Sequence, residues 1–382
     1  MPAESRSGTR GEDEIVIQTG LSDYLLEAVQ LGASDLHVTE GLPPMVRVDG
    51  KVRPLDYPTL TSNNTRDMIY DVLSNEQRQR LENDWELDFS YALPHTARFR
   101  VNVYFQRGAL GAAFRTVPDE IKSIEELGLP QVVEEMTERP RGLVLVTGPT
   151  GSGKSTTLAA MIDRINETRD EHIMSVEDPI EFLHHHKRCI VNQREVNQDT
   201  KSFAQALKHV LRQDPDVILV GEMRDLETIS LAVTAAETGH LVFGTLHTQD
   251  APQTIDRVID VFPPHQQHQI RAQLANALQG VITQTLLPHK DATGRVVACE
   301  ILLPTPGVRN LIREGKNHQI YSAMQTGGKF GMQTMDAALV TLVRRGIISR
   351  AEAEKRSSNP DELKRLMGSS SVVADSPMAV RR

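Results

Sequence analysis

A glycine-rich stretch near the middle of the chain limits the possible folds more than any other feature of the sequence. It reads GPTGSGKS over residues 148–155, between an apolar, β-branched run at 142–147 and a segment of helical character at 156–162. The pattern G-x-x-x-x-G-K-S between a buried strand and a helix is typical of a phosphate-binding P-loop. Its glycines let backbone N–H groups turn inward around phosphates, and the helix N-terminus adds the positive end of a dipole. An ordinary glycine-rich turn is the alternative, but such a turn needs neither flank. We therefore predict a nucleotide-binding α/β domain.

The residues of this loop have expected roles. Lys154 is expected to reach the β- and γ-phosphates, and the Ser155 hydroxyl is expected to bind Mg²⁺. ATP and Mg²⁺ are the predicted cofactors. The predicted nucleotide-binding residues are Gly148, Pro149, Thr150, Gly151, Ser152, Gly153, Lys154, Ser155 and Thr156.

Composition excludes several classes of protein. Of the 382 residues, 39% are hydrophobic and 24% are charged, which is ordinary for a globular protein of two or three domains. The net charge of -9 argues against a protein whose main role is to coat nucleic acid. Cys189 and Cys299 lie outside any C-x-x-C pair, so neither a zinc site nor a disulfide framework is indicated. The sequence has no apolar run of about 18 residues, and its start is polar, so we expect neither a membrane span nor a signal peptide.

The patterns along the chain predict an α+β region followed by alternating strands and helices, which implies a parallel sheet covered on both faces. The predicted regions are a disordered N-terminus (1–18), an N-terminal α+β domain (19–118), a linker (119–130), an ATPase domain (131–303), a helical region (304–367) and a disordered tail (368–382). The N-terminal strands are expected at 34–38, 45–52 (a hairpin), 87–92, 98–106 and 111–117. An uncharged stretch at 272–287 reads as an amphipathic helix because polar Gln and Asn side chains interrupt it.

Glu222 is the predicted catalytic base. It follows an apolar run at 217–220, in the place where P-loop ATPases carry an acidic group, although the run ends in Gly-Glu and not Asp-Glu. A carboxylate at the carboxyl end of a strand can orient water toward the γ-phosphate, and ligands of open α/β sheets bind at that edge. An ordinary surface carboxylate is the alternative.

Glu177 and Asp178 follow another predicted strand, at 173–176. We expect them to compensate for the missing Asp by holding the water shell of Mg²⁺, and we count Glu177 among the catalytic residues. The predicted metal-binding set is therefore Ser155, Glu177 and Asp178, the last two through water. For Asp178 the alternative is a helix N-cap before Pro179.

Histidines occur at both ends of a third predicted strand, His240 at its start and His247 just after it. Seven residues of strand span about 23 Å, so the two cannot share a metal. His247 is predicted to sense the γ-phosphate, whereas His240 fits a structural role equally well. The run at 184–186 is three consecutive histidines; on a helix these would point in different directions, so a solvated loop is favoured over a metal site.

Arg98, Arg100 and Arg115 lie on predicted strands of the N-terminal domain. If that domain packs against the nucleotide, these side chains can act as arginine fingers that neutralise charge developing on the γ-phosphate. Solvated strand arginines are the alternative.

Together these motifs resemble the secretion ATPases, the hexameric motors of type II and type IV secretion and of type IV pili. The segments that carry the resemblance are GPTGSGKSTT (148–157), VEDPIE (176–181), RQDPD leading to GEMRD (212–225), and TGH leading to TLHT (238–248). They correspond in order to the Walker A, Asp box, Walker B and His box motifs of that family. The likeness extends over about residues 20–350.

Further segments resemble the pilus retraction ATPases within that family. They are VRNLIREGK (308–316) and GMQTMD (331–336). At the front of the chain, ASDLH (33–37) and GLPP (41–44) with Asp49-Gly50 resemble the PAS-like N-terminal domain of the family. The tetracysteine zinc insert of the assembly-type relatives is absent from the sequence.

The resemblance implies a PAS-like N-terminal domain, a RecA-like ATPase domain with a helical C-terminal extension, and arginine fingers at Arg98, Arg100 and Arg115. It also implies a homohexameric ring at the cytoplasmic face of the inner membrane. There, ATP turnover would turn a platform protein and draw pilin subunits back, which powers twitching motility. A PilU-like or an assembly ATPase is a candidate second partner, and nucleic acid is not an expected one. The alternative functions are a PilU-like accessory subunit with weak turnover and a nucleic-acid translocase on the same fold.

Overall fold

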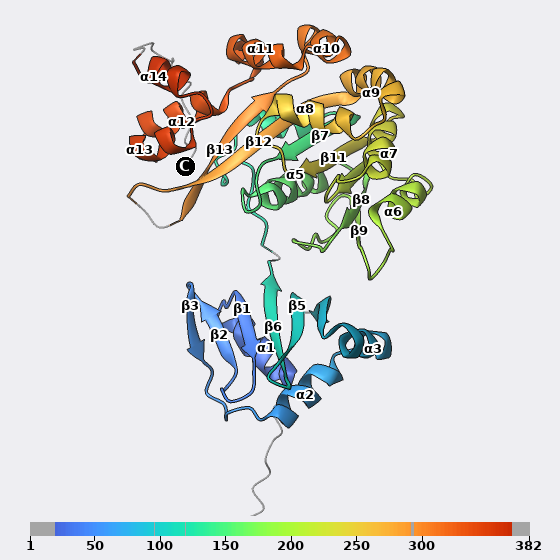
Figure 1. Cartoon of the computed structure of the whole chain (residues 1–382), viewed down its shortest axis with the longest axis vertical. Helices are drawn as coiled ribbons and strands as arrows, with labels where there is room; N and C mark the ends of the chain where they lie inside the picture. Colours follow the sequence, from blue (N-terminus) through green and yellow to red (C-terminus); the bar gives the residue numbers. More distant parts are fainter. Residues whose placement is uncertain (1–19, 95, 119, 292–293, 369–382) are drawn as a thin grey trace, which may run out of the picture. The chain divides into compact units, whose positions relative to one another are not determined.

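The computed structural model describes residues 20–94, 96–118, 120–291 and 294–368. The chain divides into two compact units, residues 1–118 and 119–382, each with its own sheet (Figure 1). The segments predicted to be disordered, 1–18 and 368–382, lie outside the described residues except for Gly368, which ends a helix. No helix in the described part of the chain combines the length and the apolar character needed to cross a membrane.

The first unit is built on a six-stranded antiparallel sheet in the order β3-β2-β1-β6-β5-β4. Its elements are α1 (Leu21–Gln30), β1 (Asp35–Val38), β2 (Met45–Val48), β3 (Lys51–Pro54), α2 (Ser62–Asp71), α3 (Asn75–Asp84), β4 (Glu86–Leu93), β5 (Ala97–Gln106) and β6 (Ala109–Val117). In the turn between β2 and β3, Asp49 and Gly50 both have positive φ, as a two-residue hairpin turn requires. The predicted α+β class of this region is confirmed.

Alternation along the strands gives this sheet one apolar and one polar face. Phe99 and Val101 on β5 and Phe114 on β6 are buried, and they pack in one core with residues of α1 and α2. The residues between them in sequence, such as Arg100 and Arg115, point to the opposite face, because successive side chains of a strand alternate.

The second unit is built on a seven-stranded sheet in the order β13-β12-β7-β11-β10-β8-β9. The strands from β12 to β9 are parallel to their neighbours, and β13 is antiparallel to β12. The strands are β7 (Gly142–Thr147), β8 (His172–Glu177), β9 (Ile190–Glu195), β10 (Val217–Val220), β11 (Leu241–Leu246), β12 (Leu278–Pro288) and β13 (Arg295–Leu302). The predicted α/β class is confirmed.

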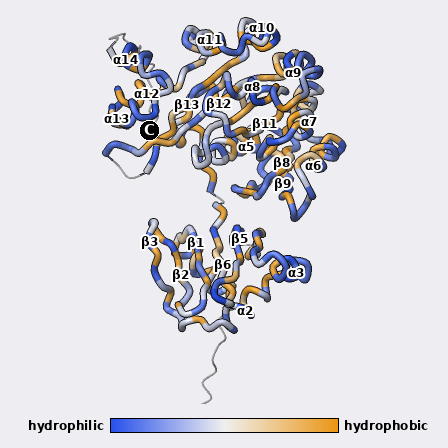
Figure 2. Tube along the Cα trace, in the orientation of Figure 1, coloured by the Kyte–Doolittle hydropathy of each residue, from blue (hydrophilic) through white to orange (hydrophobic). Residues whose placement is uncertain are grey.

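Helices cover both faces of this sheet, which is why its central strands are apolar throughout. All six residues of β7 are buried; Val144 and Val146 pack in one core with α5, and Leu143 and Leu145 pack in the other with α7 and α8. Figure 2 shows the resulting concentration of hydrophobic residues in the strands. The helices are α4 (Gln131–Thr137), α5 (Lys154–Thr168), α6 (Phe203–Val210), α7 (Leu226–Glu237), α8 (Ala251–Asp260) and α9 (Pro264–Ala277).

The helix predicted over 272–287 is wrong for most of its length. Helix α9 ends at Ala277, and Leu278 is both its C-cap and the first residue of β12, so no loop separates the two elements. Arg309 on α10 (Pro306–Arg313) fastens this junction by donating hydrogen bonds to the carbonyls of Ala275, Asn276 (2.8 Å) and Leu278 (3.0 Å). The apolar run after Ala277 pairs with β7 and β13 instead of continuing the helix.

A helical region follows β13, as predicted. After α10 it comprises α11 (Ile320–Thr326), α12 (Met335–Arg344), α13 (Arg350–Arg356), α14 (Pro360–Gly368) and two short 3₁₀ turns (Asn317–Gln319 and Gly328–Phe330). Residues of α12, α13 and α14 form a small core of their own against β12 and β13. Helix α14 occupies the end of the predicted helical region (304–367) and extends one residue beyond it.

Candidate nucleotide-binding and catalytic site

The glycine-rich loop lies between β7 and α5, as its pattern predicts. Gly148, Gly151 and Gly153 have φ values of +133°, +77° and +90°, which L side chains rarely adopt. A Cβ on Gly148 would lie 2.4 Å from the carbonyl oxygen of Gln284 and 2.7 Å from Ser152 Oγ. The loop is therefore closed tightly at its start, where a side chain has no room.

Lys154, the first residue of α5, folds back over the loop. Its Nζ donates hydrogen bonds to the carbonyl oxygens of Gly148 (2.8 Å) and Pro149 (3.1 Å). Burial lowers the pKa of Lys154, and the negative charge of Glu222 opposes that effect. The lysine is thus a cation in a partly buried position, held at the mouth of the loop and within electrostatic reach of Glu222.

This loop fits a polyphosphate. The N–H groups of the first turn of α5 (154–156) have no acceptor within the helix, as at any helix start, and they carry the positive end of its dipole. The hydroxyl of Ser152 is buried and has no hydrogen-bond partner among the described residues. Donors without partners, a glycine at the tightest point and a cation at the mouth form a site for phosphate oxygens.

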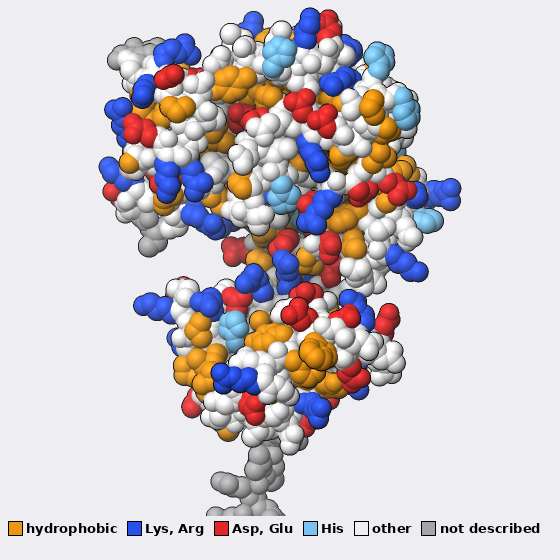
Figure 3. All heavy atoms as spheres, viewed as in Figure 1, with side chains coloured by type: hydrophobic (Ala, Val, Ile, Leu, Met, Phe, Trp, Pro, Cys, Tyr) orange, Lys and Arg blue, Asp and Glu red, His pale blue; other side chains and the backbone are white. Residues whose placement is uncertain are grey.

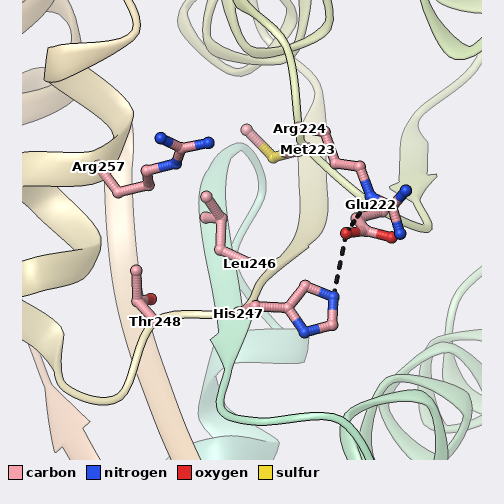
Figure 4. Close-up of a pocket in the computed structure, with 7 residues that line it drawn as sticks. All are labelled: Glu222, Met223, Arg224, Leu246, His247, Thr248 and Arg257. Carbon is pink, nitrogen blue, oxygen red and sulfur yellow. Dashed lines mark ion pairs between the residues drawn. The ribbon is translucent and has the colours of Figure 1, made fainter.

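Glu222 lies just beyond β10, where its carboxylate contacts two other residues (Figure 4). Its Oε1 is 3.0 Å from Nε2 of His247 and also pairs with Nε of Arg224. Figure 4 shows these side chains at the edge of a cavity of about 200 Å³. The residues that line the cavity are Glu222, Met223, Arg224, Leu246, His247, Thr248 and Arg257.

Short contacts between neighbouring strands fix the position of Glu222. The N–H of Gly221 donates to the carbonyl of Val176 on β8 (2.8 Å), and the N–H of Met223 donates to the carbonyl of Thr245 on β11 (3.0 Å). The Thr245 hydroxyl donates to the carbonyl of Gly221. Because the segment is bonded on both sides, the carboxylate is held with little freedom beside His247.

Arg257 is a residue of this cavity that sequence reasoning missed. It lies on α8, and its side chain points into the cavity from the side opposite Glu222 (Figure 4). Helix α8 begins four residues after His247. This short distance from a predicted site residue could have drawn attention to the polar side chains of the helix, including Arg257.

Glu177 and Asp178 end β8 but differ in their surroundings. Glu177 is buried; its Oε1 accepts hydrogen bonds from the Ser175 hydroxyl (2.6 Å) and from Gln193 Nε2 (3.2 Å). Burial raises the pKa of Glu177, and these hydrogen bonds only partly oppose it. Asp178 is exposed, and no helix follows it, so the N-cap interpretation is wrong. Since β8 is three strands away from β7, about 14 Å across the sheet, the pair shares an edge with the P-loop without adjoining it.

The remaining histidines have structural surroundings. Nδ1 of His240 is 3.0 Å from the carbonyl of Ala235, which matches the structural interpretation. The run at 184–186 lies in an irregular segment, where His186 Nδ1 accepts a hydrogen bond from the N–H of Val191. In the part of the chain that the structure describes, no group of three or more His, Cys, Asp or Glu side chains is placed to hold a metal ion.

The three predicted arginine fingers share the polar face of the first unit's sheet. Arg100 on β5 lies directly opposite Arg115 on β6, and Arg98 is two residues before Arg100 on the same face. Arg115 donates from Nε to Asp35 Oδ1 on β1 (2.9 Å). Arg47 on β2 lies on the other side of the same carboxylate, 3.7 Å from Oδ2. The three arginines therefore share one face of the sheet, and Asp35 pairs with Arg115 and Arg47 on that face.

Comparison with known proteins identifies the family of this chain. The model of the type II/IV secretion system protein family matches residues 10–355, most of the chain. The chain belongs to this family. It is 55% identical to the type IV pilus retraction ATPase PilT of Pseudomonas aeruginosa over 89% of this chain and 99% of the relative. It is 41% identical to the type IV pilus ATPase PilU of the same organism over 88% of each chain.

A solved structure extends the likeness to three dimensions. A crystal structure of the pilus retraction motor PilT with bound ADP superposes with a TM-score of 0.85 and 52% sequence identity, covering 91% of this chain and all of that one. As a member of the type II/IV secretion system family, the chain is a P-loop ATPase, and the resemblance inferred from its sequence is confirmed.

Proposed function

We propose that this chain is the ATP-hydrolysing motor of type IV pilus retraction, acting as a homohexamer at the cytoplasmic face of the inner membrane. The observation that carries the hydrolytic part is the contact of Glu222 with His247 beside the P-loop lysine. The biological role is supported by the relatives, since the retraction ATPase PilT matches over nearly its whole length. A platform protein of the membrane is the proposed mechanical partner.

Glu222 is placed to act on an attacking water. The contacts of Glu222 with His247 and Arg224 both use Oε1, and Oε2 can accept the proton of a water that enters the cavity. His247 contacts the Glu222 carboxylate and also lines the cavity. A γ-phosphate in the cavity could therefore act on Glu222 through the contact between Glu222 and His247. Arg257, on the opposite wall, is placed to bind a phosphate oxygen.

The P-loop supplies binding and charge. Lys154 exchanges its bonds with the loop carbonyls for the β- and γ-phosphate oxygens, and the first-turn N–H groups of α5 bind the same anion. Mg²⁺, when bound, neutralises charge on the β- and γ-phosphates. The exposed hydroxyl of Ser155 would hold it, and the exposed Asp178 suits its outer water shell better than Glu177, whose Oε1 is already hydrogen-bonded.

Arg98, Arg100 and Arg115 are proposed to complete the site as arginine fingers, once an N-terminal domain faces a nucleotide. Their position on one polar sheet face lets a single rigid surface present all three. Hydrolysis would then change the contacts of that face, which is how turnover becomes movement between domains.

The test removes the base and leaves the site intact. Replacing Glu222 with Gln keeps the shape of the side chain and should lower Mg²⁺-dependent phosphate release about 10³-fold without preventing ADP binding. Lys154→Ala should abolish nucleotide binding as well. Glu227→Gln is the matched control, because Glu227 is an exposed carboxylate nearby that pairs with Lys208. Turnover in Glu222→Gln equal to that of the control would refute the assignment of the base.

A second candidate is the accessory subunit with weak turnover that the sequence resemblance also allows, and the type IV pilus ATPase PilU is 41% identical to this chain. The two differ in a measurable way. A retraction motor should restore twitching to a Pseudomonas aeruginosa strain that lacks its own PilT, and Glu222→Gln should fail to do so. An accessory subunit should restore nothing in that strain, even with Glu222 intact.

A further inference from the structure

Gln284 on β12 contacts the P-loop from the neighbouring strand. Its side chain is buried, and Nε2 donates a hydrogen bond to the carbonyl oxygen of Ser152 (2.9 Å). Its backbone oxygen is the atom that leaves no space for a Cβ on Gly148, and its Nε2 would lie 3.1 Å from a Cβ on Gly153. One residue of β12 thus touches the loop at its beginning, at its turn and at its end.

This contact is one of three side-chain links between β12 and β7 with its flanks. Gln279, near the start of β12, donates from Nε2 to the carbonyl of Arg141 just before β7 (3.1 Å). In between, the hydroxyls of Thr283 and Thr147 are 2.8 Å apart. Gln279 and Gln284 therefore make the same kind of bond at opposite ends of β7, one far from the loop and one within it.

The geometry of a peptide unit gives the Gln284 bond a specific effect. In a trans peptide the C=O of one residue and the N–H of the next point in opposite directions. When Gln284 holds the Ser152 carbonyl toward β12, the N–H of Gly153 in the same peptide unit is directed away from β12. Gly153 has φ +90°, and as a glycine it can adopt a wider range of φ than other residues, so a hydrogen bond that fixes this peptide unit matters.

We propose that Gln284 is a positioning residue for nucleotide binding: its amide holds the peptide unit between Ser152 and Gly153 in the orientation that presents the Gly153 N–H to phosphate. The proposal rests on the nucleotide binding proposed above. Gln284 does not touch the nucleotide in this role. Without the amide, the peptide unit is free to turn its carbonyl toward the phosphates, which both removes a donor and adds repulsion.

The matched pair of glutamines supplies the main experiment. Gln284→Met should weaken ADP binding about tenfold, the effect of losing one hydrogen bond to a charged group, as measured by titration calorimetry on the full chain. Gln279→Met removes an equivalent bond to a backbone carbonyl and should leave ADP affinity unchanged. In the nucleotide-free protein, amide hydrogen exchange at residues 148–156 should accelerate in Gln284→Met and not in Gln279→Met.

A second variant tests the direction of the hydrogen bond. Gln284→Glu replaces the donor with a carboxylate facing a carbonyl oxygen in a buried position, so its pKa should be raised. At pH 8 ADP binding should be weakened by more than tenfold. As the pH falls toward 5, the protonated carboxyl regains an O–H that can donate to Ser152, and the affinity relative to the wild type should recover. A purely steric role for Gln284 predicts no such recovery.

The outcomes separate this proposal from the proposed function. A wild-type chain that does not bind ADP would overturn the proposed function itself. If the wild type binds and both Met variants weaken binding equally, Gln284 acts only through the stability of the sheet and the positioning role is wrong. Unchanged affinity in Gln284→Met would also overturn it. If Gln284→Met fails to fold, Gln284→Glu measured between pH 5 and pH 8 decides the question alone.

Discussion

The two sheets of this chain present their functional side chains in different ways. In the first unit the sheet is antiparallel and apolar on one face only, so Arg98, Arg100 and Arg115 form a row on the open face. In the second unit the sheet is mostly parallel and covered on both faces, and the charged side chains of the candidate site, Glu222 and His247, come just after the ends of β10 and β11. The first arrangement presents a row of charge across a sheet face, and the second brings charged side chains together at one edge of a sheet. On the face of the second unit seen in Figure 3, acidic and basic side chains both occur.

The largest expected effect tests whether the open face acts in turnover. Arg115→Met should lower ATP hydrolysis about 10³-fold, as the loss of an arginine finger does, because the transition-state charge is no longer neutralised. Binding of ADP to the second unit should be unchanged. The measurement is steady-state phosphate release beside calorimetric ADP binding.

Arg47→Met is the control for that experiment, since Arg47 pairs with the same Asp35 from the other side. It should keep its turnover. If Arg115→Met and Arg47→Met lose the same amount of ATP hydrolysis, the arginines act through Asp35 and the folding of the sheet. The polar face would then have no direct role in turnover, and the proposed difference between the two units would be wrong.

The second prediction compares one buried carboxyl in each unit through pH. Burial raises the pKa of Glu300 on β13 from 4.5 to about 7, although its Oε1 accepts a hydrogen bond from the N–H of Ala251. Burial also acts on Asp35, but hydrogen bonds from Ser34 and Arg115 and the charge of Arg115 outweigh it and lower its pKa. The two groups must therefore affect stability in opposite directions.

Because the folded state keeps Glu300 protonated, its contribution to stability is full below pH 4.5 and is lost as the pH rises through about 7, by roughly 3 kcal/mol. Asp35 contributes stability above its ordinary pKa and loses it as the pH falls through the lowered value. Thermal unfolding between pH 3 and pH 8 should show that Glu300→Gln reduces the loss of stability at high pH. Asp35→Asn should reduce the loss of stability at low pH. A Glu300→Gln curve parallel to that of the wild type would contradict the assignment.

The smallest effects concern one glycine in each unit. Gly148→Ala places a Cβ against Gln284 and Ser152 at φ +133°, and should cost about 2 kcal/mol of stability and much of the nucleotide affinity. Gly50→Ala, at φ +77° with no atom within 4 Å of the new Cβ, should cost about 1 kcal/mol and leave nucleotide binding unchanged. Chemical denaturation and ADP titration of both variants would show whether backbone strain alone lowers stability, or whether the side chain at Gly148 also lowers nucleotide affinity by disturbing the closed loop.

Local patterns predicted much of this molecule. The P-loop was predictable because its glycines, lysine and flanks are contiguous, and the strand ends at Glu222 and His247 were predictable because parallel strands share one functional edge. The family resemblance followed from those same contiguous motifs. The hairpin at Asp49-Gly50 was likewise set by its own turn residues.

What the sequence did not reveal depends on neighbours far apart in the chain. Gln284 lies about 130 residues after the P-loop, and only the order of strands places β12 beside β7. The same stretch was predicted as helix because its Gln and Asn residues suggest a polar helical face, whereas pairing on both sides makes it a strand. Arg257 was missed for a similar reason, because a helix face shows its direction only once it is packed. The alternative interpretation of Asp178 as a helix N-cap was wrong because Pro179, which resembles a helix start, is followed by irregular structure.

The direct passage from α9 into β12 has a mechanical consequence. With no loop between them, a displacement of the helix along its axis is passed directly to the start of β12, where the pairing with β7 shifts register between Leu278 and Gly280, and along the strand toward Thr283 and Gln284 at the loop. Arg309 makes α10 part of the same body. Force applied to α10 from outside would then change how tightly a nucleotide is held some distance away, and, by thermodynamic reciprocity, occupancy of the loop would change how α10 engages whatever applies that force.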